Sequence, residues 1–246
     1  MPNGVAVKQI RRQRSLAELA TKEIRTAIIN GDLGLGEPIS EGALAMALGI
    51  SKTPVREALA QLRVEGLVTI VPQKGAFVFT LSAKEVIQIC ELRYTLESAA
   101  LRFSYERNYA SYCEALQDVV RKMTQVGCED NVREYLRLDT VFHEQFFKYC
   151  DNACLADAYN LIVGKVAALR THLAARPEHT SKSYKEHMEI ANALQTRDPD
   201  GAIAILEVHI ARTKESYSQN IEDIAAADRA SRSRKEPSLA LKSIRR

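Results

Sequence analysis

The sequence has no long hydrophobic run. A helix needs about 18 consecutive apolar residues to cross a bilayer, and no such stretch occurs in the 246 residues. The opening segment, MPNGVAVKQIRRQRS, carries charges where a signal peptide has its apolar stretch. These absences argue against a membrane-spanning helix and against secretion, so we expect the protein to stay in the cytoplasm, away from membranes.

Cysteine is scarce, and its five residues form no CxxC pair. Cys150 and Cys154 are four positions apart, but a predicted helix break at Asp151 and Asn152 separates them, which weakens a metal-binding or redox interpretation. An odd number of scattered cysteines does not indicate a disulfide framework. We expect reduced thiols that pack as small hydrophobic side chains.

The composition that is present is that of a globular protein. Hydrophobic residues make up 46% and charged residues 26%, which is enough apolar material to bury a core. The length favours a small module joined to a larger one. Residues 1–80 carry ten basic and seven acidic side chains (+3), residues 81–220 carry seventeen and twenty (−3), and residues 221–246 carry seven and four (+3). A basic front part suggests a polyanionic partner if its charges gather on one face.

Residues 1–80 show the order of elements of a winged helix-turn-helix domain preceded by an N-terminal arm. Apolar residues recur at helical spacing over 16–30, and a glycine-rich loop or short extended segment follows. Residues 40–49, SEGALAMALG, form a short helix with a serine cap and a glycine stop. A second helix begins at Ser51 or Lys52 and stops at a glycine, so two short helices are joined by a tight turn.

Two β-rich runs follow in the segment LVTIVPQKGAFVFT. They are separated by Pro72, Gln73, Lys74 and Gly75, which predicts a hairpin with a basic tip. The hairpin would supply the wing of the domain.

From residue 81 onward no strand pattern recurs, and helical periodicity dominates. The predicted helices lie near 82–107, 110–126, 131–150, 154–175, 181–197 and 199–220. The fold class we expect is therefore mainly α, with a winged helix-turn-helix and a small β-hairpin over 1–80 and an all-α six-helix bundle over 81–220. Residues 221–246 are rich in alanine, serine and basic residues, and we expect a disordered basic tail.

A recognition helix presents its base-reading side chains from the N-terminal turn, because only that end projects fully into the major groove. Lys52 and Arg56 share a face of the second short helix, and short hydroxyl groups beside them suit phosphates or bases. Lysine and glycine at the hairpin tip fit a wing that touches the minor groove or the backbone. The candidate DNA-binding residues are Ser51, Lys52, Thr53, Arg56, Lys74 and Gly75. Each taken alone is explained as well by a solvated surface position, and their combination favours DNA binding.

The segment ISEGALAMALGISKTPVREALAQLRVEGLVTIVPQKGAFV resembles the DNA-binding domain of GntR-family bacterial regulators. By this resemblance, Lys52 stands where the family usually has a base-reading arginine, Arg56 matches a second reading arginine, and the hairpin tip matches the wing. One position departs from the family pattern. Gly42, which follows Glu41, stands where the family often has a basic residue, so operator preference or affinity is expected to be altered.

Four residues of the bundle are candidate metal ligands. Asp139 and His143 are four positions apart in RLDTVFHEQFFKY, so a carboxylate and an imidazole project from one helix face. His187 and His209 each lie in the middle of an amphipathic helix. Three imidazoles and a carboxylate can bind a divalent ion, zinc first and nickel or manganese as alternatives, and leave positions open. No spacing rule connects residues on three helices, so an ordinary interior or surface role remains open for each histidine.

The six helices resemble the FCD-type effector domain attached to one branch of GntR-family regulators, over about residues 82–218. This resemblance implies that Asp139, His143, His187 and His209 bind one metal. It also matches Arg93 to an arginine that many such domains aim into the cavity, where it would bind an effector carboxylate. A salt bridge between Arg93 and Glu97, one turn on, is the alternative. The two remaining histidines, His172 and His179, are expected to be solvated.

The function implied is that of a homodimeric transcription regulator rather than an enzyme. Its partners would be double-stranded DNA with a near-palindromic operator and a small carboxylate or sugar-acid effector that changes operator affinity, with repression as the output. Two alternatives stay open. A metal-dependent enzyme could use the same Asp and three histidines, although no further Glu or His is placed as a base, and a metal that only clamps the bundle would leave DNA binding constitutive.

Overall fold

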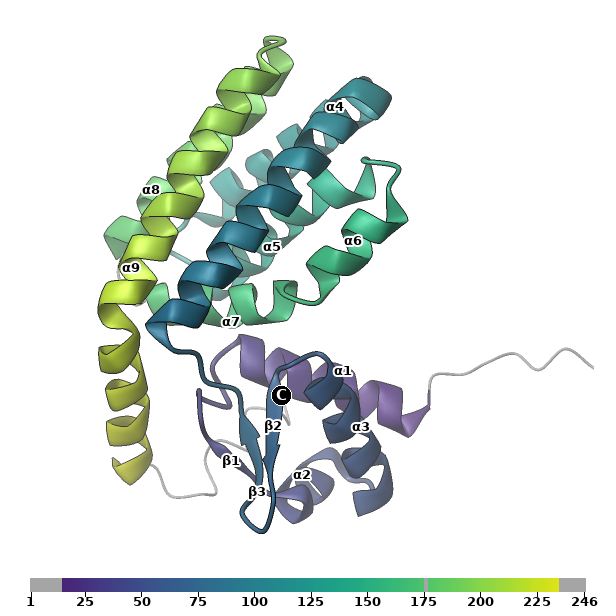
Figure 1. Cartoon of the computed structure of the whole chain (residues 1–246), viewed down its shortest axis with the longest axis vertical. Helices are drawn as coiled ribbons and strands as arrows, with labels where there is room; N and C mark the ends of the chain where they lie inside the picture. The colour runs from purple at the N-terminus through teal and green to yellow at the C-terminus, as the bar shows by residue number, and fades with distance from the viewer. Residues whose placement is uncertain (1–14, 175–176, 235–246) are drawn as a thin grey trace, which may run out of the picture.

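The computed structural model describes residues 15–174 and 177–234, so the predicted N-terminal arm before residue 15 and the tail after residue 234 lie outside it. The described residues form a small module below and a helical bundle above (Figure 1). The small module contains α1 (Leu16–Ile29), β1 (Pro38–Ile39), α2 (Glu41–Leu48), α3 (Lys52–Val64), β2 (Val68–Val71) and β3 (Gly75–Val78). The bundle contains α4 (Ala83–Val126), α5 (Val132–Lys148), α6 (Ala153–Asn160), α7 (Val163–Leu173), α8 (Pro177–Gln195) and α9 (Pro199–Arg234). The mainly helical fold class predicted from the sequence is confirmed.

Local sequence signals set the boundaries of the small module. Ser15 and Glu18 form a capping box that starts α1. Ser40 caps α2, and Gly49 ends it in the left-handed conformation, with φ of 68°. The tight turn between α2 and α3 that the sequence predicts at this glycine is therefore present.

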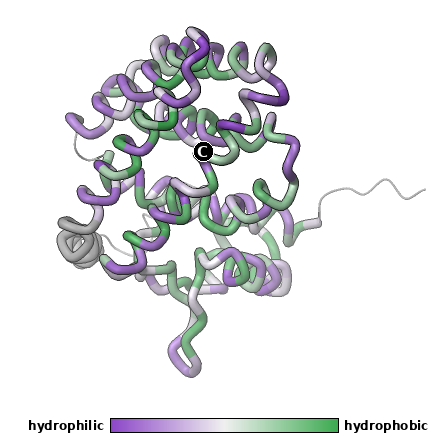
Figure 2. Tube along the Cα trace, turned by 45° about the horizontal axis from the view of Figure 1, so that its top comes forward, coloured by the Kyte–Doolittle hydropathy of each residue, from purple (hydrophilic) through white to green (hydrophobic). Residues whose placement is uncertain are grey.

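The wing is a three-stranded antiparallel sheet in the order β1-β3-β2. Val68 pairs with Val78 and Val71 with Gly75, which leaves Pro72, Gln73 and Lys74 in the connecting turn. β1 adds Pro38 and Ile39 opposite Phe77 and Ala76. The hairpin projects from the body of the molecule with hydrophilic residues at its tip (Figure 2).

The core of the small module joins α1 to α3. Ile24 and Ile28 of α1 and Val55, Leu59 and Leu62 of α3 are all buried. The Arg25 guanidinium donates to both carboxylate oxygens of Glu65, the C-cap of α3, at 2.8 and 2.7 Å. Because α1 is bound to α3 along its length and at its end, the two helices are held as one unit.

The bundle differs from its predicted helices at two points. The segments expected at 82–107 and 110–126 form one helix, α4, with a kink at Asn108, where the φ/ψ angles are −135° and 39°. The helix expected over 154–175 is two helices, α6 and α7, which meet at Leu161 and Ile162. Neither glycine nor proline marks that break, so the sequence offered no local signal for it.

The last helix, α9, continues to Arg234 and so passes residue 220, where the folded part was expected to end. The segment AAADRASRSR is rich in alanine, the residue of highest helix propensity, which gives a physical reason for the extension. None of the described helices is long and apolar enough to cross a membrane.

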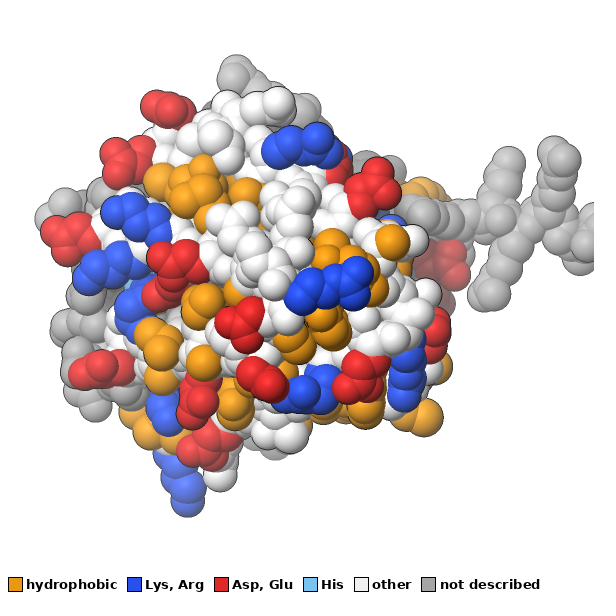
Figure 3. Space-filling view, turned by 90° about the horizontal axis from the view of Figure 1, so that it is seen from above, with side chains coloured by type: hydrophobic (Ala, Val, Ile, Leu, Met, Phe, Trp, Pro, Cys, Tyr) orange, Lys and Arg blue, Asp and Glu red, His pale blue; other side chains and the backbone are white. Residues whose placement is uncertain are grey.

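Seen from the bundle end, acidic and basic side chains are interspersed, with hydrophobic side chains between them (Figure 3).

The thiols of Cys90, Cys113 and Cys150 are buried, as expected of small hydrophobic side chains, whereas Cys154 is exposed.

Candidate functional site

The predicted DNA-binding residues of α3 lie together at its N-terminal end. Ser51, Lys52, Thr53 and Arg56 are all exposed, while Val55 on the opposite face is buried. Ser51 is the N-cap, but its side chain makes no capping hydrogen bond, so its hydroxyl is available to another acceptor or donor. The Arg56 guanidinium donates to Glu41 of α2 at 2.6 Å, and this exposed ion pair orients the side chain.

Gly42, the position at which the family often has a basic residue, faces the side chain of Lys52. A Cβ added to Gly42 would lie 3.6 Å from Cε and 3.9 Å from Nζ of Lys52. The lysine therefore occupies the space beside the glycine. Lys74 and Gly75 are exposed at the tip of the hairpin, and Gly75 has φ of 104°.

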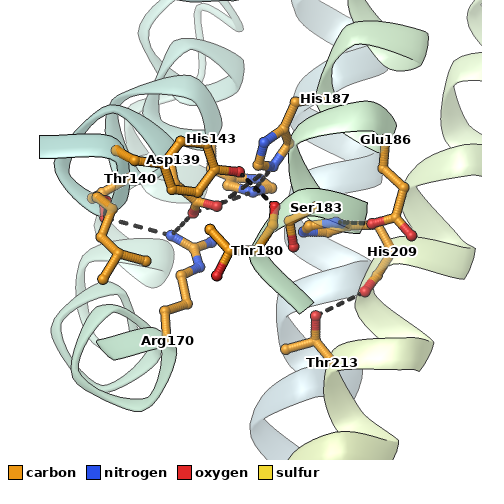
Figure 4. A network of polar contacts seen from close by, with 12 residues as sticks. Asp139, Thr140, His143, Arg170, Thr180, Ser183, Glu186, His187, His209 and Thr213 are labelled. Atoms are coloured by element: carbon orange, nitrogen blue, oxygen red, sulfur yellow. Dashed lines mark hydrogen bonds and ion pairs between the residues drawn. The ribbon is translucent and has the colours of Figure 1, made fainter. Parts of the chain in front are cut away.

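The four predicted metal ligands converge inside the bundle from three helices (Figure 4). The ligand atoms of His143, His187 and His209 lie within 4.8 Å of one another, and all three side chains are buried. Nε2 of His187 lies 3.2 Å from Nε2 of His143. Asp139 lies at the edge of this histidine cluster, with its carboxylate oxygens 3.9 Å from Nε2 of His143 and 3.7 Å from Nε2 of His187.

Carboxylates outside the cluster bind the opposite ring nitrogens of two of these histidines. Glu97 lies 2.8 Å from Nδ1 of His143, and Glu186 lies 2.7 Å from Nδ1 of His209. A carboxylate at Nδ1 keeps the proton there and leaves the lone pair on Nε2, which is the arrangement of metal-binding histidines. In both residues the Nε2 lone pair is directed to the centre of the cluster.

Burial keeps the imidazoles neutral. It lowers the pKa of His143 well below its usual value, and the charges of Arg93 and Arg170 act in the same direction. Burial likewise lowers the pKa of His187 to about 3, against the opposing charge of Asp139. Burial alone would raise the pKa of Asp139, but the charge of Arg170 overrides it and holds that pKa low. At neutral pH the cluster therefore offers three lone pairs and one carboxylate, as a metal requires.

Arg93 is buried beside the cluster and makes the salt bridge that sequence analysis kept as an alternative, with Nε 2.7 Å from Glu97. Its Nη2 lies 3.0 Å from Nε2 and 3.3 Å from Nδ1 of His143, and 3.5 Å from Nε2 of His209. Arg93 therefore contacts both ring nitrogens of His143, with the shorter distance to Nε2.

Arg170 of α7 was not singled out from the sequence, yet it is buried and lies 2.6 Å from Asp139. Its second terminal nitrogen, Nη2, is buried without a hydrogen-bond partner. A cavity of about 10 Å³ beside Arg170 and Asp139 is lined by the hydroxyl-bearing Thr180, Ser183 and Thr213. That volume holds about one water molecule.

Three residues that complete the site were therefore missed, namely Glu97, Arg170 and Glu186. Glu186 directly precedes a candidate ligand, and Glu97 was considered as a partner of Arg93 and as a weaker cavity candidate, without being assigned. No sequence pattern connects Arg170 with the ligands.

The expectation that His179 is solvated was wrong. α8 begins at Pro177, earlier than predicted, and so brings the half-buried His179 against α9. Nη1 of Arg212 lies 2.7 Å from its Nδ1. Burial and the charge of Arg212 lower the pKa of His179 to about 4.

The donor set fits a divalent metal ion. Its three imidazole nitrogens and one carboxylate are the ligands that zinc, nickel and manganese accept. Nδ1 of His187 is buried without a hydrogen-bond partner, so its ring is held by packing, including a contact of 4.6 Å between ring centres with Phe142. Two ion pairs, Arg93 with Glu97 and Arg170 with Asp139, leave the surroundings neutral, so a bound dication would give the site a net positive charge.

Two family models match the chain. "Bacterial regulatory proteins, gntR family" matches residues 16–78, and "FCD domain" matches residues 88–212. The "Nta operon transcriptional regulator" of Aminobacter aminovorans is 30% identical over 78% of this chain and 88% of its own length. The "Probable D-xylose utilization operon transcriptional repressor" of Paenarthrobacter nicotinovorans is 29% identical over 83% of this chain and 89% of its own length. Among solved structures, E. coli McbR/YncC is similar in fold, with a TM-score of 0.71 and 20% identity over 87% of this chain and 99% of that one.

Proposed function

The chain belongs to the gntR family of bacterial regulatory proteins and carries an FCD domain, and we propose that it is a metal-containing repressor that responds to a small organic acid. It is a transcription regulator rather than an enzyme. The relatives include proteins named as repressors, which supports repression as the output. Its place of action is the cytoplasm, where the DNA lies.

We assign operator binding to the N-terminal end of α3 and to the hairpin tip. Lys52 and Arg56 contact bases in the major groove, Ser51 and Thr53 contact bases or phosphates, and the hairpin tip, with Lys74 and Gly75, touches the minor groove or backbone. The support is exposure of all these residues next to a buried helix face. Two copies of the chain bind as a homodimer to the half-sites of a near-palindrome.

We assign metal binding to Asp139, His143, His187 and His209. Zinc suits this donor set first, and nickel or manganese are the alternatives. Bound metal would supply a positive charge with open coordination positions. The protein contributes the orientation of the ligands, through Glu97 and Glu186 at the outer nitrogens.

The effector is a small carboxylate or sugar acid. Arg93 and Arg170 both lie against the ligands, and Arg170 has a buried cationic nitrogen without a partner. A buried donor of this kind is stabilised by an anionic oxygen. The cavity lined by Thr180, Ser183 and Thr213 has a volume of about 10 Å³, so the bundle must open there for these hydroxyl groups to bind polar groups of the same ligand.

The observation that carries this proposal is the convergence of three buried imidazoles, next to Asp139 and two arginines, in a chain that also has an exposed recognition helix. The test is a titration of small carboxylic and sugar acids against the complex of the full chain with DNA from upstream of its own gene. We expect an acid to change operator affinity about fivefold to 150-fold, and a chelator to abolish the change. Operator affinity that responds to no acid, with or without metal, would show that the metal only clamps the bundle.

A further inference from the structure

Helix α7 contacts both functional parts of the molecule. Gly164, Ala167 and Thr171 recur at spacings of three and four and so share one side of the helix. Arg170, the neighbour of Thr171, lies on the side toward the bundle interior and pairs with Asp139 at 2.6 Å. Consecutive residues thus contact different domains.

The contact with the small module is a helix cap made across the domain boundary. The Thr171 hydroxyl donates to the carbonyl oxygen of Ile29, the last residue of α1, at 2.6 Å. Carbonyls of the last helical turn have no partner inside their own helix, so an external donor there stabilises the helix end. The fit is close, because a Cβ added to Gly31 would lie 3.5 Å from Cγ2 of Thr171.

The beginning of α7 packs on the small module as well. A Cβ added to Gly164 would lie 3.1 Å from Cδ1 of Leu67, the residue before β2. Between these contacts the domains do not pack tightly, since a cavity of about 810 Å³ lies among α1, α5 and α7. The Thr171 hydroxyl therefore makes a polar contact between the two domains at α7.

From α1 the connection continues to the DNA-reading helix. Arg25 of α1 forms its two-bonded pair with Glu65 at the end of α3. Ile24 and Ile28 of α1 and Leu62 of α3 are buried in one core. A displacement of α1 would therefore move α3 and the side chains at its exposed end.

We propose that α7 transmits the state of the metal site to the DNA-binding domain, with Arg170 as the contact to the metal ligand Asp139 and Thr171 as the contact to α1. This inference rests on the proposed function, because it needs a cation to be bound at the cluster. The charge of Asp139 is then shared between Arg170 and that cation, which weakens the ion pair that positions α7. A helix held less firmly at Arg170 shifts at Thr171, and the cap on α1 shifts with it.

The experiment measures the operator affinity of the full-length protein in its zinc-loaded and zinc-stripped forms, by gel shift or fluorescence anisotropy. The quantity of interest is the ratio of the two dissociation constants. Thr171→Val removes the hydroxyl at nearly constant volume, Thr171→Ser retains it, and Thr95→Val is the matched control, because the Thr95 hydroxyl donates to Glu91 inside its own helix. Zinc affinity is measured for each protein in the absence of DNA.

We expect the two dissociation constants to differ about fivefold or more in the wild type, Thr95→Val and Thr171→Ser. In Thr171→Val the ratio should be near one. Zinc affinity should be equal in all four proteins. A wild-type ratio in Thr171→Val would overturn the proposal, since the signal would then travel elsewhere, for instance through the segment that joins β3 to α4. A ratio of one in the wild type would overturn it too. Failure of the wild type to bind zinc would overturn the proposed function itself, and is distinguished by the DNA-free measurement.

A second comparison tests whether both residues act on one route. Arg170→Met and Thr171→Val are combined, and the ratio is measured for the single and double variants. If the two residues act in series, the ratio of dissociation constants in the double variant equals the ratio in Thr171→Val alone. Because Thr171→Val alone is expected to bring the ratio near one, the deciding single variant is Arg170→Met, and a wild-type ratio in it would contradict a route through α7.

Discussion

The carboxylate of Glu186 lies 2.7 Å from Nδ1 of His209, whereas the next residue, His187, directs its Nε2 to within 3.2 Å of Nε2 of His143. Adjacent residues of α8 thus act on the histidine cluster from outside and from inside. Arg212 holds Glu186 in place with two further contacts. Burial opposes ionisation of Glu186, but hydrogen bonds from His209 and Arg212 prevail and lower its pKa to about 2. The carboxylate is therefore charged when it orients His209.

We expect Glu186→Gln to weaken zinc binding about 10- to 100-fold, because an amide orients His209 less firmly and makes its Nε2 less basic. Competition with a chromophoric chelator measures the affinity. Glu189→Gln is the matched control, since Glu189 is exposed on the same helix. Equal zinc affinity in both variants would show that Glu186 does not support the ligand.

His187→Ala should lose most of its bound zinc and all response of operator binding to carboxylic acids. The reason is that one of the three converging imidazoles, and with it one metal ligand, disappears from the site. Elemental analysis of the purified protein gives the zinc content. His172→Gln, a change on α7 outside the cluster, should retain it. A fully metallated His187→Ala protein would exclude His187 from the site.

Arg56→Ala should weaken operator binding by about 1–3 kcal/mol, because a bidentate arginine contact to a guanine contributes that much to base discrimination. Zinc content and thermal stability should not change, since Arg56 is exposed and its pair with Glu41 lies at the surface. Arg63→Ala, an exposed change farther along the same helix, is the control. Operator affinity equal to that of the wild type would contradict the assignment of Arg56 to the recognition surface.

Local signals predicted the small module well, and they predicted the bundle less completely. Ser40 and Gly49 mark helix ends by cap chemistry that acts over one turn, so the sequence alone locates them. The interruption expected between residues 107 and 110 is found as the kink at Asn108, whereas no glycine or proline marks the break between α6 and α7.

The metal ligands likewise include residues that local spacing predicts and residues that only tertiary contacts bring together. Asp139 and His143 share a helix face by spacing alone, whereas joining them to His187 and His209 required the resemblance to a known domain. Arg170 comes from a fourth helix, and its pairing with Asp139 is a tertiary contact without any counterpart in sequence spacing.

The last prediction concerns pH and rests on His179, which is not a metal ligand. Its pKa is lowered to about 4 in the folded protein by burial and by the charge of Arg212, against about 6.5 in an unfolded chain. Below pH of about 6.5 the unfolded chain takes up a proton that the folded protein excludes, so stability is complete above that pH and is lost as the pH falls toward 4. His179→Gln removes this contribution. In the presence of a chelator, we expect the fall in Tm between pH of about 6.5 and 5 to be smaller in His179→Gln than in the wild type, because the variant lacks the imidazole that is protonated only in the unfolded chain. Circular dichroism melting curves at both pH values measure the difference. An unchanged fall in Tm would mean that His179 accepts a proton in the folded state, and that Arg212 does not hold it neutral.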